Sequence, residues 1–217
     1  GEAWESVATG KGERKFFKLA DGTEVWLNNA SQLRVKKGFG YSDRKLELIG
    51  EAYFKVTKNK KLPLSIKAQG TVVEVLGTVF NLRAYPEDAS TVTSLLEGKV
   101  RLRVENQAED MALLLQPGDK VEVFQKNQNH GPVAQAADAQ IMPEAVLFTK
   151  LQLKDKHVED LLWIENKLVF NGDRFREVLH KLERWYNKTI IVQHNDLDKE
   201  VFTGQFEEKS CEELLDL

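Results

Sequence analysis

The segment Leu96-Glu-Gly98-Lys-Val-Arg-Leu-Arg-Val104 contains the main structural motif of the sequence. It places an apolar residue just ahead of a glycine and continues with apolar residues two apart. Period-two alternation is typical of a half-buried strand, and the glycine supplies the positive φ that a turn or bulge requires. The unit therefore predicts a corner followed by a β-strand.

The same unit recurs four more times within the first 124 residues. The other copies are Leu19-Ala-Asp-Gly22-Thr-Glu-Val-Trp-Leu27, Leu48-Ile-Gly50-Glu-Ala-Tyr53, Leu76-Gly77-Thr-Val-Phe80 and Gln116-Pro-Gly118-Asp-Lys-Val-Glu-Val123. The glycines at 22, 50, 77, 98 and 118 are 28, 27, 21 and 20 residues apart, too regular for unrelated loops and too irregular for a strict short-period solenoid. We expect residues 1–145 to form a repetitive, mostly antiparallel, twisted β-structure of solenoid or sandwich type, with each glycine at a turn, bulge or strand start.

Composition excludes several classes of protein. The chain has 217 residues, of which 41% are hydrophobic and 30% are charged, as in ordinary globular domains. The 31 basic and 34 acidic residues are interspersed and give a net charge of -3, so there is no basic field to neutralise phosphates. We therefore expect no nucleic-acid partner.

The sequence also lacks membrane and export signals. No apolar run approaches the ~20 residues of a membrane helix, and Gly1-Glu-Ala-Trp-Glu5 does not resemble a signal peptide. The single cysteine, Cys211, allows no intramolecular disulfide and leaves the redox compartment open. The chain reads as a soluble cytoplasmic protein or as the excised soluble portion of a larger one.

The alternating pattern fails at residues 125–145, which are polar, rich in alanine and contain Gly131-Pro132. We expect three segments: an all-β domain over residues 1–145, a connector over 146–162 and a small α/β domain over 163–217.

The tail has its own order of elements. Leu168-Val-Phe170 predicts a strand, and Asp173 is placed to cap a helix that ends near Asn187. Ile190-Ile-Val192 and Val201–Phe206 predict two further strands, and Ser210 with Glu213 forms a capping box for a second helix. The predicted order is β-α-β-β-α.

Motifs for catalysis or cofactor binding are missing from the sequence. It contains no G-x-S-x-G elbow, Walker loop or G-x-G-x-x-G unit after a strand. The histidines at 130, 157, 180 and 194 lack partners at metal-ligand spacing, and Cys211 in an amphipathic helix is more often inert than catalytic. We expect no catalytic residue, no metal and no cofactor, and hence no enzyme.

Aromatic residues support an alternative, a carbohydrate-binding β-domain with an appended α/β module. The aromatic set is Trp26, Phe39, Tyr41, Tyr53, Phe54, Phe80 and Tyr85. Most of these stand at alternating strand positions, where core packing explains them, so a sugar site requires outward rings grouped in one groove.

The glycine units belong to longer segments, which are Leu19–Asn28, Leu48–Val56, Val75–Asn81 with Ala84-Tyr-Pro86, Leu96–Val100 and Leu115–Gly118. Together these segments resemble the FecR family of anti-sigma regulators, and the resemblance covers nearly the whole sequence. In the tail, Trp163, Leu168–Phe170, Leu182–Tyr186 and Phe202–Gly204 resemble the carboxy-terminal domain of the family's Bacteroidetes branch.

The resemblance implies a regulator of cell-surface signalling. Such proteins join a cytoplasmic segment that binds an extracytoplasmic-function sigma factor to one membrane helix and a periplasmic part. The periplasmic part receives a signal from a TonB-dependent outer-membrane transducer. This chain resembles the periplasmic part alone, so a sigma factor would be reached only through a cytoplasmic segment outside this sequence.

The contact with the transducer is expected in the tail, at a strand edge. The first candidate is the strand that carries Val201, Phe202, Thr203, Gln205 and Phe206, because an exposed edge can pair with a partner strand. An ordinary internal strand explains it equally well. A second candidate is the adjacent pair Trp185 and Tyr186, whose rings point about 100° apart on a helix, so that one can face outward.

Overall fold

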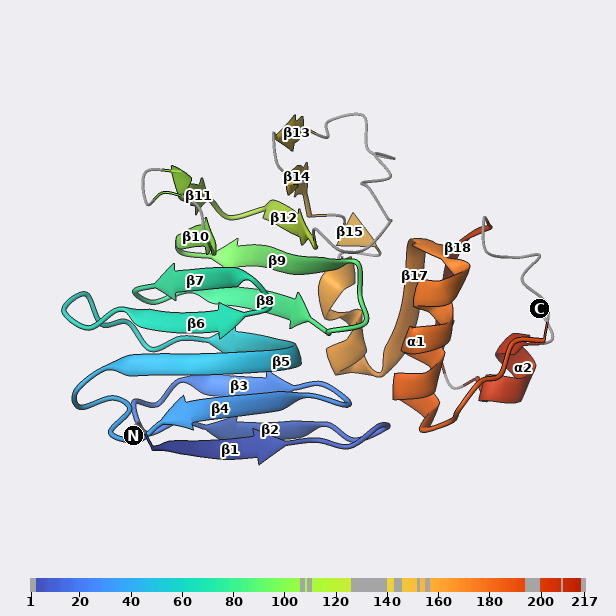
Figure 1. Cartoon of the computed structure of the whole chain (residues 1–217), viewed down its shortest axis with the longest axis horizontal. Helices are drawn as coiled ribbons and strands as arrows, with labels where there is room; N and C mark the ends of the chain where they lie inside the picture. Colours follow the sequence, from blue (N-terminus) through green and yellow to red (C-terminus); the bar gives the residue numbers. More distant parts are fainter. Residues whose placement is uncertain are drawn as a thin grey trace.

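The computed structural model describes residues 3–105, 108, 111–125, 140–142, 146–151, 153–154, 157–193, 200–207 and 209–215. It consists of a large stack of β-strands with a smaller α/β unit against one side (Figure 1). We call these the β-domain and the tail domain. The expected fold class, all-β followed by α+β, is confirmed.

The β-domain contains strands β1 to β14. They are β1 (Trp4–Ala8), β2 (Lys15–Lys18), β3 (Glu24–Leu27), β4 (Gln32–Lys36), β5 (Arg44–Lys55), β6 (Leu64–Ala68), β7 (Thr71–Val75), β8 (Val79–Ala84), β9 (Ser90–Glu97), β10 (Val100–Val104), β11 (Leu113–Leu115), β12 (Asp119–Phe124), β13 (Gln140–Met142) and β14 (Val146–Lys150).

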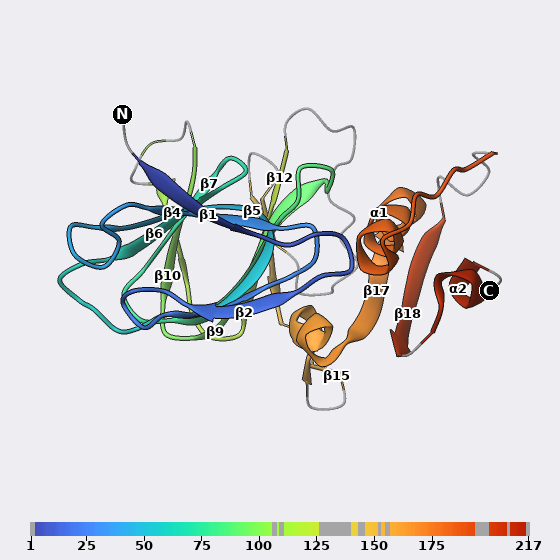
Figure 2. The same ribbon diagram turned by 90° about the horizontal axis from the view of Figure 1, so that it is seen from below.

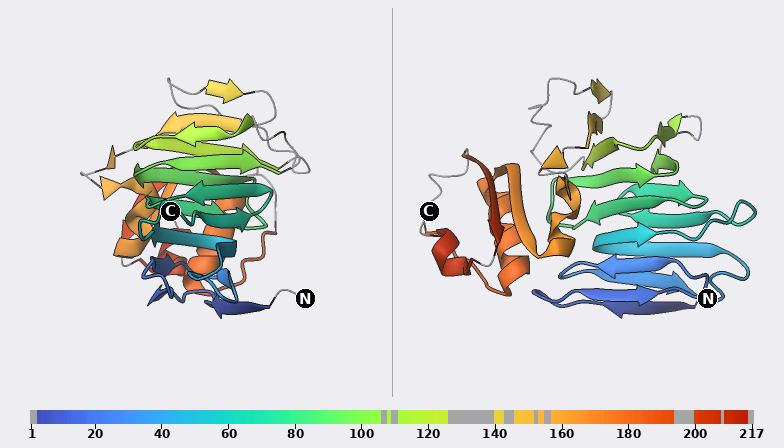
Figure 3. Two further views of the ribbon diagram at one scale, coloured as in Figure 1. Left: turned by 90° about the vertical axis from the view of Figure 1, so that its left-hand side faces the viewer. Right: turned by 180° about the vertical axis from the view of Figure 1, so that it is seen from behind.

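These strands form one curled sheet in the order β11-β10-β7-β6-β5-β8-β9-β12-β14-β13, to which β1 to β4 are added beside β5. Among the described pairs only β5 and β6 run parallel, so the sheet is mostly antiparallel, as expected. Figure 2 shows the sheet folded into two layers, and Figure 3 shows the strands stacked from β1 at one end to β14 and β13 at the other.

The long strand β5 passes from one layer to the other at Gly50. Before this residue β5 pairs with β4 and β6, and from it onward with β3 and β8. Gly50 has a φ of +95°, and a Cβ there would lie 2.2 Å from the Oγ of Ser31. The corner therefore requires glycine for both conformation and space. The other four repeat glycines lie in turns or bends just before a strand, which confirms the prediction made from the repeat.

The core lies between the two layers and takes every second side chain from strands such as β6, β7 and β12. Leu64 and Ile66 of β6 and Phe80 and Leu82 of β8 have no exposed surface. Full burial of such a side chain stabilises the fold by about 1.5 to 3 kcal/mol. The intervening residues point outward, and on the layer that contains β8, β9 and β12 they face the tail domain.

The tail domain follows a short hairpin. The elements are β15 (Leu153–Lys154), β16 (His157–Val158), the 3-10 helix η2 (Glu159–Glu165), β17 (Lys167–Arg174), α1 (Phe175–Tyr186), β18 (Val201–Glu207) and α2 (Cys211–Leu215). β17 and β18 form an antiparallel pair, and α1 packs against it through Leu168, Phe170, Val178 and Leu182.

Both expected helices are present, with one difference at a helix start. Asn187 ends α1 with a φ of 53°, and Ser210 and Glu213 exchange the two hydrogen bonds of a capping box at α2. Asp173, however, does not cap α1. It lies in β17 and forms an ion pair with Lys181 at 2.5 Å, while Arg174 occupies the N-cap position.

The strand expected at Ile190–Val192 is absent. These residues belong to no strand, and the Ile190 N–H donates to Oε1 of Glu183 instead of to a neighbouring strand. The side chain of Ile190 packs on the tail core. Ile191, by contrast, is 84% exposed, so the run is not buried as a whole. The described tail sheet has two strands where three were expected.

The expected connector over 146–162 also requires correction. Val146–Lys150 forms β14, which pairs with β12, so the β-domain extends to Lys150. Residues 126–139 of the polar stretch lie outside the described residues. Among the helices that the structure describes, none combines the length and apolar character needed to cross a bilayer.

Candidate functional site

The outer face of the β-domain that meets the tail domain carries two rows of polar residues. One row runs through Asn81, Ser94 and Lys120 on β8, β9 and β12. The next row contains Glu51 on β5, Arg83 on β8 and Glu122 on β12. Successive strand residues alternate between faces, so these side chains turn away from the apolar core.

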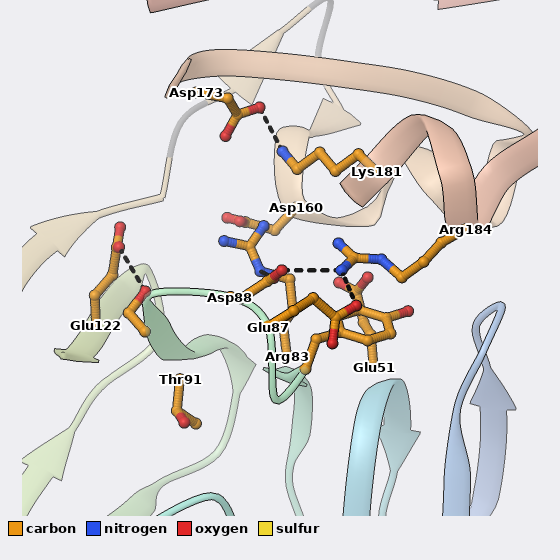
Figure 4. A network of polar contacts seen from close by, with 12 residues as sticks. Glu51, Arg83, Glu87, Asp88, Thr91, Glu122, Asp160, Asp173, Lys181 and Arg184 are labelled. Atoms are coloured by element: carbon orange, nitrogen blue, oxygen red, sulfur yellow. Dashed lines mark hydrogen bonds and ion pairs between the residues drawn. The ribbon is translucent and has the colours of Figure 1, made fainter. Parts of the chain in front are cut away.

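Arg184 of α1 is the main link between the domains. It is buried, and its Nη1 lies 2.6 Å from Oε1 of Glu87 and 2.9 Å from Oδ1 of Asp88 (Figure 4). Its guanidinium also lies 3.8 Å from the centroid of the Tyr85 ring. Burial alone would lower the pKa of Arg184, but Asp88 and the other neighbours outweigh this effect and raise it. The arginine therefore remains charged.

Residues from the amino-terminal part of the chain make a second set of contacts, with the carboxy-terminal end of α1. The Gly12 N–H donates to the Arg184 carbonyl at 2.7 Å, and the Arg14 guanidinium lies 4.0 Å from the Trp185 ring centroid. Arg14 also donates to Asn28 and to Asn166. We call Gly12, Arg14, Tyr85, Glu87, Asp88, Arg184 and Trp185 the clamp, because together they fix α1 to the β-domain.

A separate ion pair joins β12 to η2. Nζ of Lys120 lies 2.9 Å from Oδ1 of Asp160. Burial alone would raise the pKa of Asp160, but Lys120 outweighs it and the pKa is lowered. The pair therefore stays charged and ties η2 to the sheet.

Glu51 lies beside the clamp and is buried, and no cation in the described part of the chain forms an ion pair with it. Its carboxylate accepts hydrogen bonds from Asn28 Nδ2 and Asn81 Nδ2, each at 2.8 Å. Burial raises the pKa of Glu51 despite the two amides and nearby Arg83.

Between the domains lies a cleft of about 220 Å³. Its walls come from the outer face of the sheet, from η2 and from β17 and α1, and they are rich in both acidic and basic side chains. Figure 4 shows Arg83 among Asp88, Asp160 and Glu51, with Glu122 and Lys181 farther out.

The described residues offer no grouping of three or more His, Cys, Asp or Glu side chains suited to a metal. The Cys211 thiol is buried, and burial raises its pKa, which makes it a poor nucleophile. The acidic and basic side chains between the domains are mostly joined in ion pairs and hydrogen bonds, and these contacts dock the tail domain on the β-domain.

The predicted partner residues fall into two groups. On β18, Phe202 and Phe206 turn toward the tail core, whereas Val201 and Thr203 are exposed and Gln205 is half-buried. Trp185 does not face outward, since its ring stacks with Arg14 inside the clamp. The hydroxyl of Tyr186 donates to the Lys209 carbonyl, so this ring is tied to the segment before α2.

The aromatic residues do not form the groove that a sugar site requires. Phe39, Phe54, Phe80 and Tyr85 are buried, and Tyr41 is exposed in a turn. Phe16, Trp26 and Tyr53 form a ladder across β2, β3 and β5, but neighbouring rings are tilted by 45° and 54° and do not form a flat platform.

Sequence reasoning did not identify Arg14, Glu51, Arg83 or Arg184. The one available signal was at Arg184, a charged residue beside the aromatic pair 185–186 on an otherwise amphipathic helix. Its partners lie about a hundred positions earlier, and no local pattern connects them.

Two family models match the chain. The model described as "FecR protein" matches residues 5–101, and the model described as "FecR, C-terminal" matches residues 167–217. The chain belongs to the FecR family. The two FecR matches fall on the β-domain and the tail domain, which are the two parts seen in the structure.

Solved structures agree with the assignment to FecR. Two crystal structures of a candidate anti-sigma factor from Parabacteroides distasonis ATCC 8503, at 2.50 Å and 1.65 Å, each match with a TM-score of 0.80 and 27% identity. They cover 99% and 98% of this chain and 89% of the other chain. No curated protein matches the sequence. Membership in the FecR family identifies the chain as a signalling regulator of the anti-sigma type.

Proposed function

We propose that this chain is the periplasmic signalling region of a membrane-anchored FecR regulator. In this role the tail domain binds the signalling domain of a TonB-dependent outer-membrane transducer, and the regulator controls an extracytoplasmic-function sigma factor through a separate cytoplasmic segment. The β-domain acts as a rigid spacer. Family membership supports the regulatory role, and the open edge of β18 supports the tail as the receiving surface.

The edge of β18 is the observation that carries the proposal. β18 pairs with β17 on one side, and among the described residues no strand pairs with it on the other. An unpaired edge presents a row of N–H and C=O groups that a partner strand can extend.

The contacts of β17 indicate which groups of β18 point outward. The Val169 carbonyl accepts from Lys181 Nζ, and the Asn171 N–H donates to Asp173, so both residues direct main-chain groups away from β18. Their partners in the register are Gln205 and Thr203. In an antiparallel pair, opposite residues turn their main-chain groups the same way, inward or outward. The N–H groups of Thr203 and Gln205 therefore face the open side.

Gln205 is the better position for a test. The hydroxyl of Thr203 accepts from the Gly172 N–H at 3.0 Å, so a change at Thr203 also disturbs the bulge in β17. Gly204 is also unsuitable, because a Cβ there would lie 2.9 Å from the Phe206 ring.

The experiment compares Gln205→Pro with Gln205→Ala in calorimetric titrations against the purified signalling domain of the transducer. Proline removes the outward N–H, so we expect affinity to fall at least about tenfold, whereas alanine should bind like the parent. Circular dichroism and thermal unfolding establish that both variants are folded. Equal binding by folded Gln205→Pro would place the contact elsewhere, and no binding by the parent would refute the proposed function.

A further inference from the structure

The cleft between the domains has features of a small-molecule site. Clefts between domains are preferred positions for ligand binding, and a volume of about 220 Å³ is below that of typical drug-sized pockets. The cleft therefore suits a molecule the size of an amino acid. The β-domain and the tail domain both contribute charged walls.

Most of the carboxylates in the cleft already have strong partners. Asp160 is paired with Lys120, and Asp173 with Lys181. Glu51 is held by two amides. Glu122 differs, since it accepts a long hydrogen bond of 3.3 Å from the Ser90 hydroxyl, and within the described part of the chain no ion pair reaches it.

Arg83 has donors that the described protein does not use. Its Nε lies 3.4 Å from Oδ2 of Asp88 and makes no hydrogen bond, and no described residue makes a hydrogen bond to its two terminal nitrogens. Asp88 is already engaged by Arg184. A guanidinium carries five N–H donors in a fork that fits a carboxylate, so Arg83 presents an open anion-binding group within the cleft.

The electrostatic surroundings of Arg83 limit the kind of ligand. Burial alone would lower its pKa, but Asp88, Glu51, Asp173 and Glu122 outweigh burial and raise it above its ordinary value. A simple anion bound to Arg83 would meet repulsion from these carboxylates. A ligand that also carries a positive charge would find attraction at both ends.

We propose that the cleft binds a small zwitterion of the α-amino-acid class, with its carboxylate on Arg83 and its ammonium group on Glu122. The two residues occupy the same outward row, on β8 and β12, with one strand between them. Neighbouring strands lie about 4.8 Å apart, and two such spacings separate β8 from β12. The two side chains can therefore flank a molecule of this size. The tail domain closes the other side through Trp163, whose buried Nε1 makes no hydrogen bond to any described residue.

Binding of a zwitterion in the cleft requires no transducer. Binding in the cleft would contact both domains at once, so the ligand would stabilise their docked arrangement by mass action. The zwitterion would thus be a second input to the regulator.

The test is a calorimetric titration of the full chain with glycine, alanine and glycylglycine at constant ionic strength, alongside acetate and ethylamine. We expect saturable binding of glycine or alanine. Acetate and ethylamine should bind about tenfold more weakly, because each carries one charge and can form only one of the two charge-assisted contacts. Saturable binding by glycylglycine alone would overturn the assignment to an amino acid. Acetate bound as tightly as the amino acids, or no saturation by any probe, would overturn the proposal.

Three variants, at two positions, tie the binding to the cleft. Arg83→Gln and Glu122→Gln should each weaken the zwitterion about tenfold, whereas Arg101→Gln on the other layer should not change it. Arg83→Lys keeps the charge and loses the fork, so it should fall between the parent and Arg83→Gln. Circular dichroism checks the fold of each variant. If Arg83→Gln does not fold, Glu122→Gln provides the test, because Glu122 is only half-buried. Unchanged binding in a folded Arg83 or Glu122 variant would exclude the cleft.

Discussion

The guanidinium of Arg14 lies 4.0 Å from the ring centroid of Trp185, although 171 positions separate the two residues. The adjacent residue, Arg184, makes a second stack on Tyr85 at 3.8 Å. Two cation–π contacts from successive helix residues, each worth about 0.5 to 2 kcal/mol, fix both the position and the rotation of α1. The orientation of the tail domain is therefore set by the β-domain.

Replacing Arg184 with alanine should destabilise the docked state strongly. The change leaves Asp88 buried without its main partner, and breaking a buried pair in this way typically costs about 3 to 5 kcal/mol. Urea unfolding measures the loss. Lys188→Ala, which breaks an exposed pair with Glu212, is the matched control and should unfold like the parent. Similar midpoints for the two variants would show that the clamp adds little.

The ion pair between Lys120 and Asp160 should make the stability depend on pH in a defined direction. The pKa of Asp160 is lowered in the folded state from its ordinary 3.8, so its contribution is full above pH 3.8 and is lost as pH falls toward the folded value. The stability difference between the parent and Asp160→Asn should be largest near pH 7 and shrink below about pH 4. Urea titrations at several pH values measure it, and a constant difference would contradict the assigned direction.

Two glycines with similar φ separate backbone strain from steric clash. Gly118 has a φ of +92° and open space where a Cβ would lie, so Gly118→Ala should cost about 1 to 2 kcal/mol from conformation alone. Gly50 has a φ of +95°, and a Cβ there would lie within 2.2 Å of Ser31. Gly50→Ala should therefore cost more, about 3 kcal/mol or above. Thermal unfolding compares them, and equal losses would mean that Ser31 moves aside freely.

The thiol of Cys211 should report opening of the tail domain. It is buried at the start of α2, and burial raises its pKa, so a disulfide reagent at pH 7 should react far more slowly with the folded chain than with the chain in urea. The reaction is followed by the absorbance of the thiolate that the reagent releases. Arg184→Ala tests whether release of the clamp also loosens the tail, and rapid reaction of the parent would show that α2 does not protect the thiol.

The sequence predicted the features whose causes are local. The five glycines marked corners because positive φ and alternation are local properties, and Ser210 with Glu213 marked a helix start for the same reason. The strand predicted at Ile190–Val192 failed because a strand also needs a pairing partner, which an apolar run cannot reveal. Asp173 was misread as a cap because its ion pair with Lys181 depends on how α1 packs over β17.

The candidate site was mostly invisible for a related reason. Arg83, Glu51 and Glu122 occupy ordinary outward positions of strands, and each would read as a solvated surface charge. These residues line a cleft only because the tail domain covers that face of the sheet. The β18 edge was anticipated from its alternation, and its role as a partner site stays a prediction that Gln205→Pro can test.

The clamp also has a consequence for the order in which the chain matures. Gly12 and Arg14 lie far ahead of Arg184 and Trp185 in the sequence. The β-domain can form its sheet from the residues that precede α1, but the closing contacts require α1 as well. Contacts of such high sequence separation are slow to form, because the loop they close is long. Until then the charged face of the sheet remains uncovered, so we expect docking of the tail domain to follow formation of the sheet.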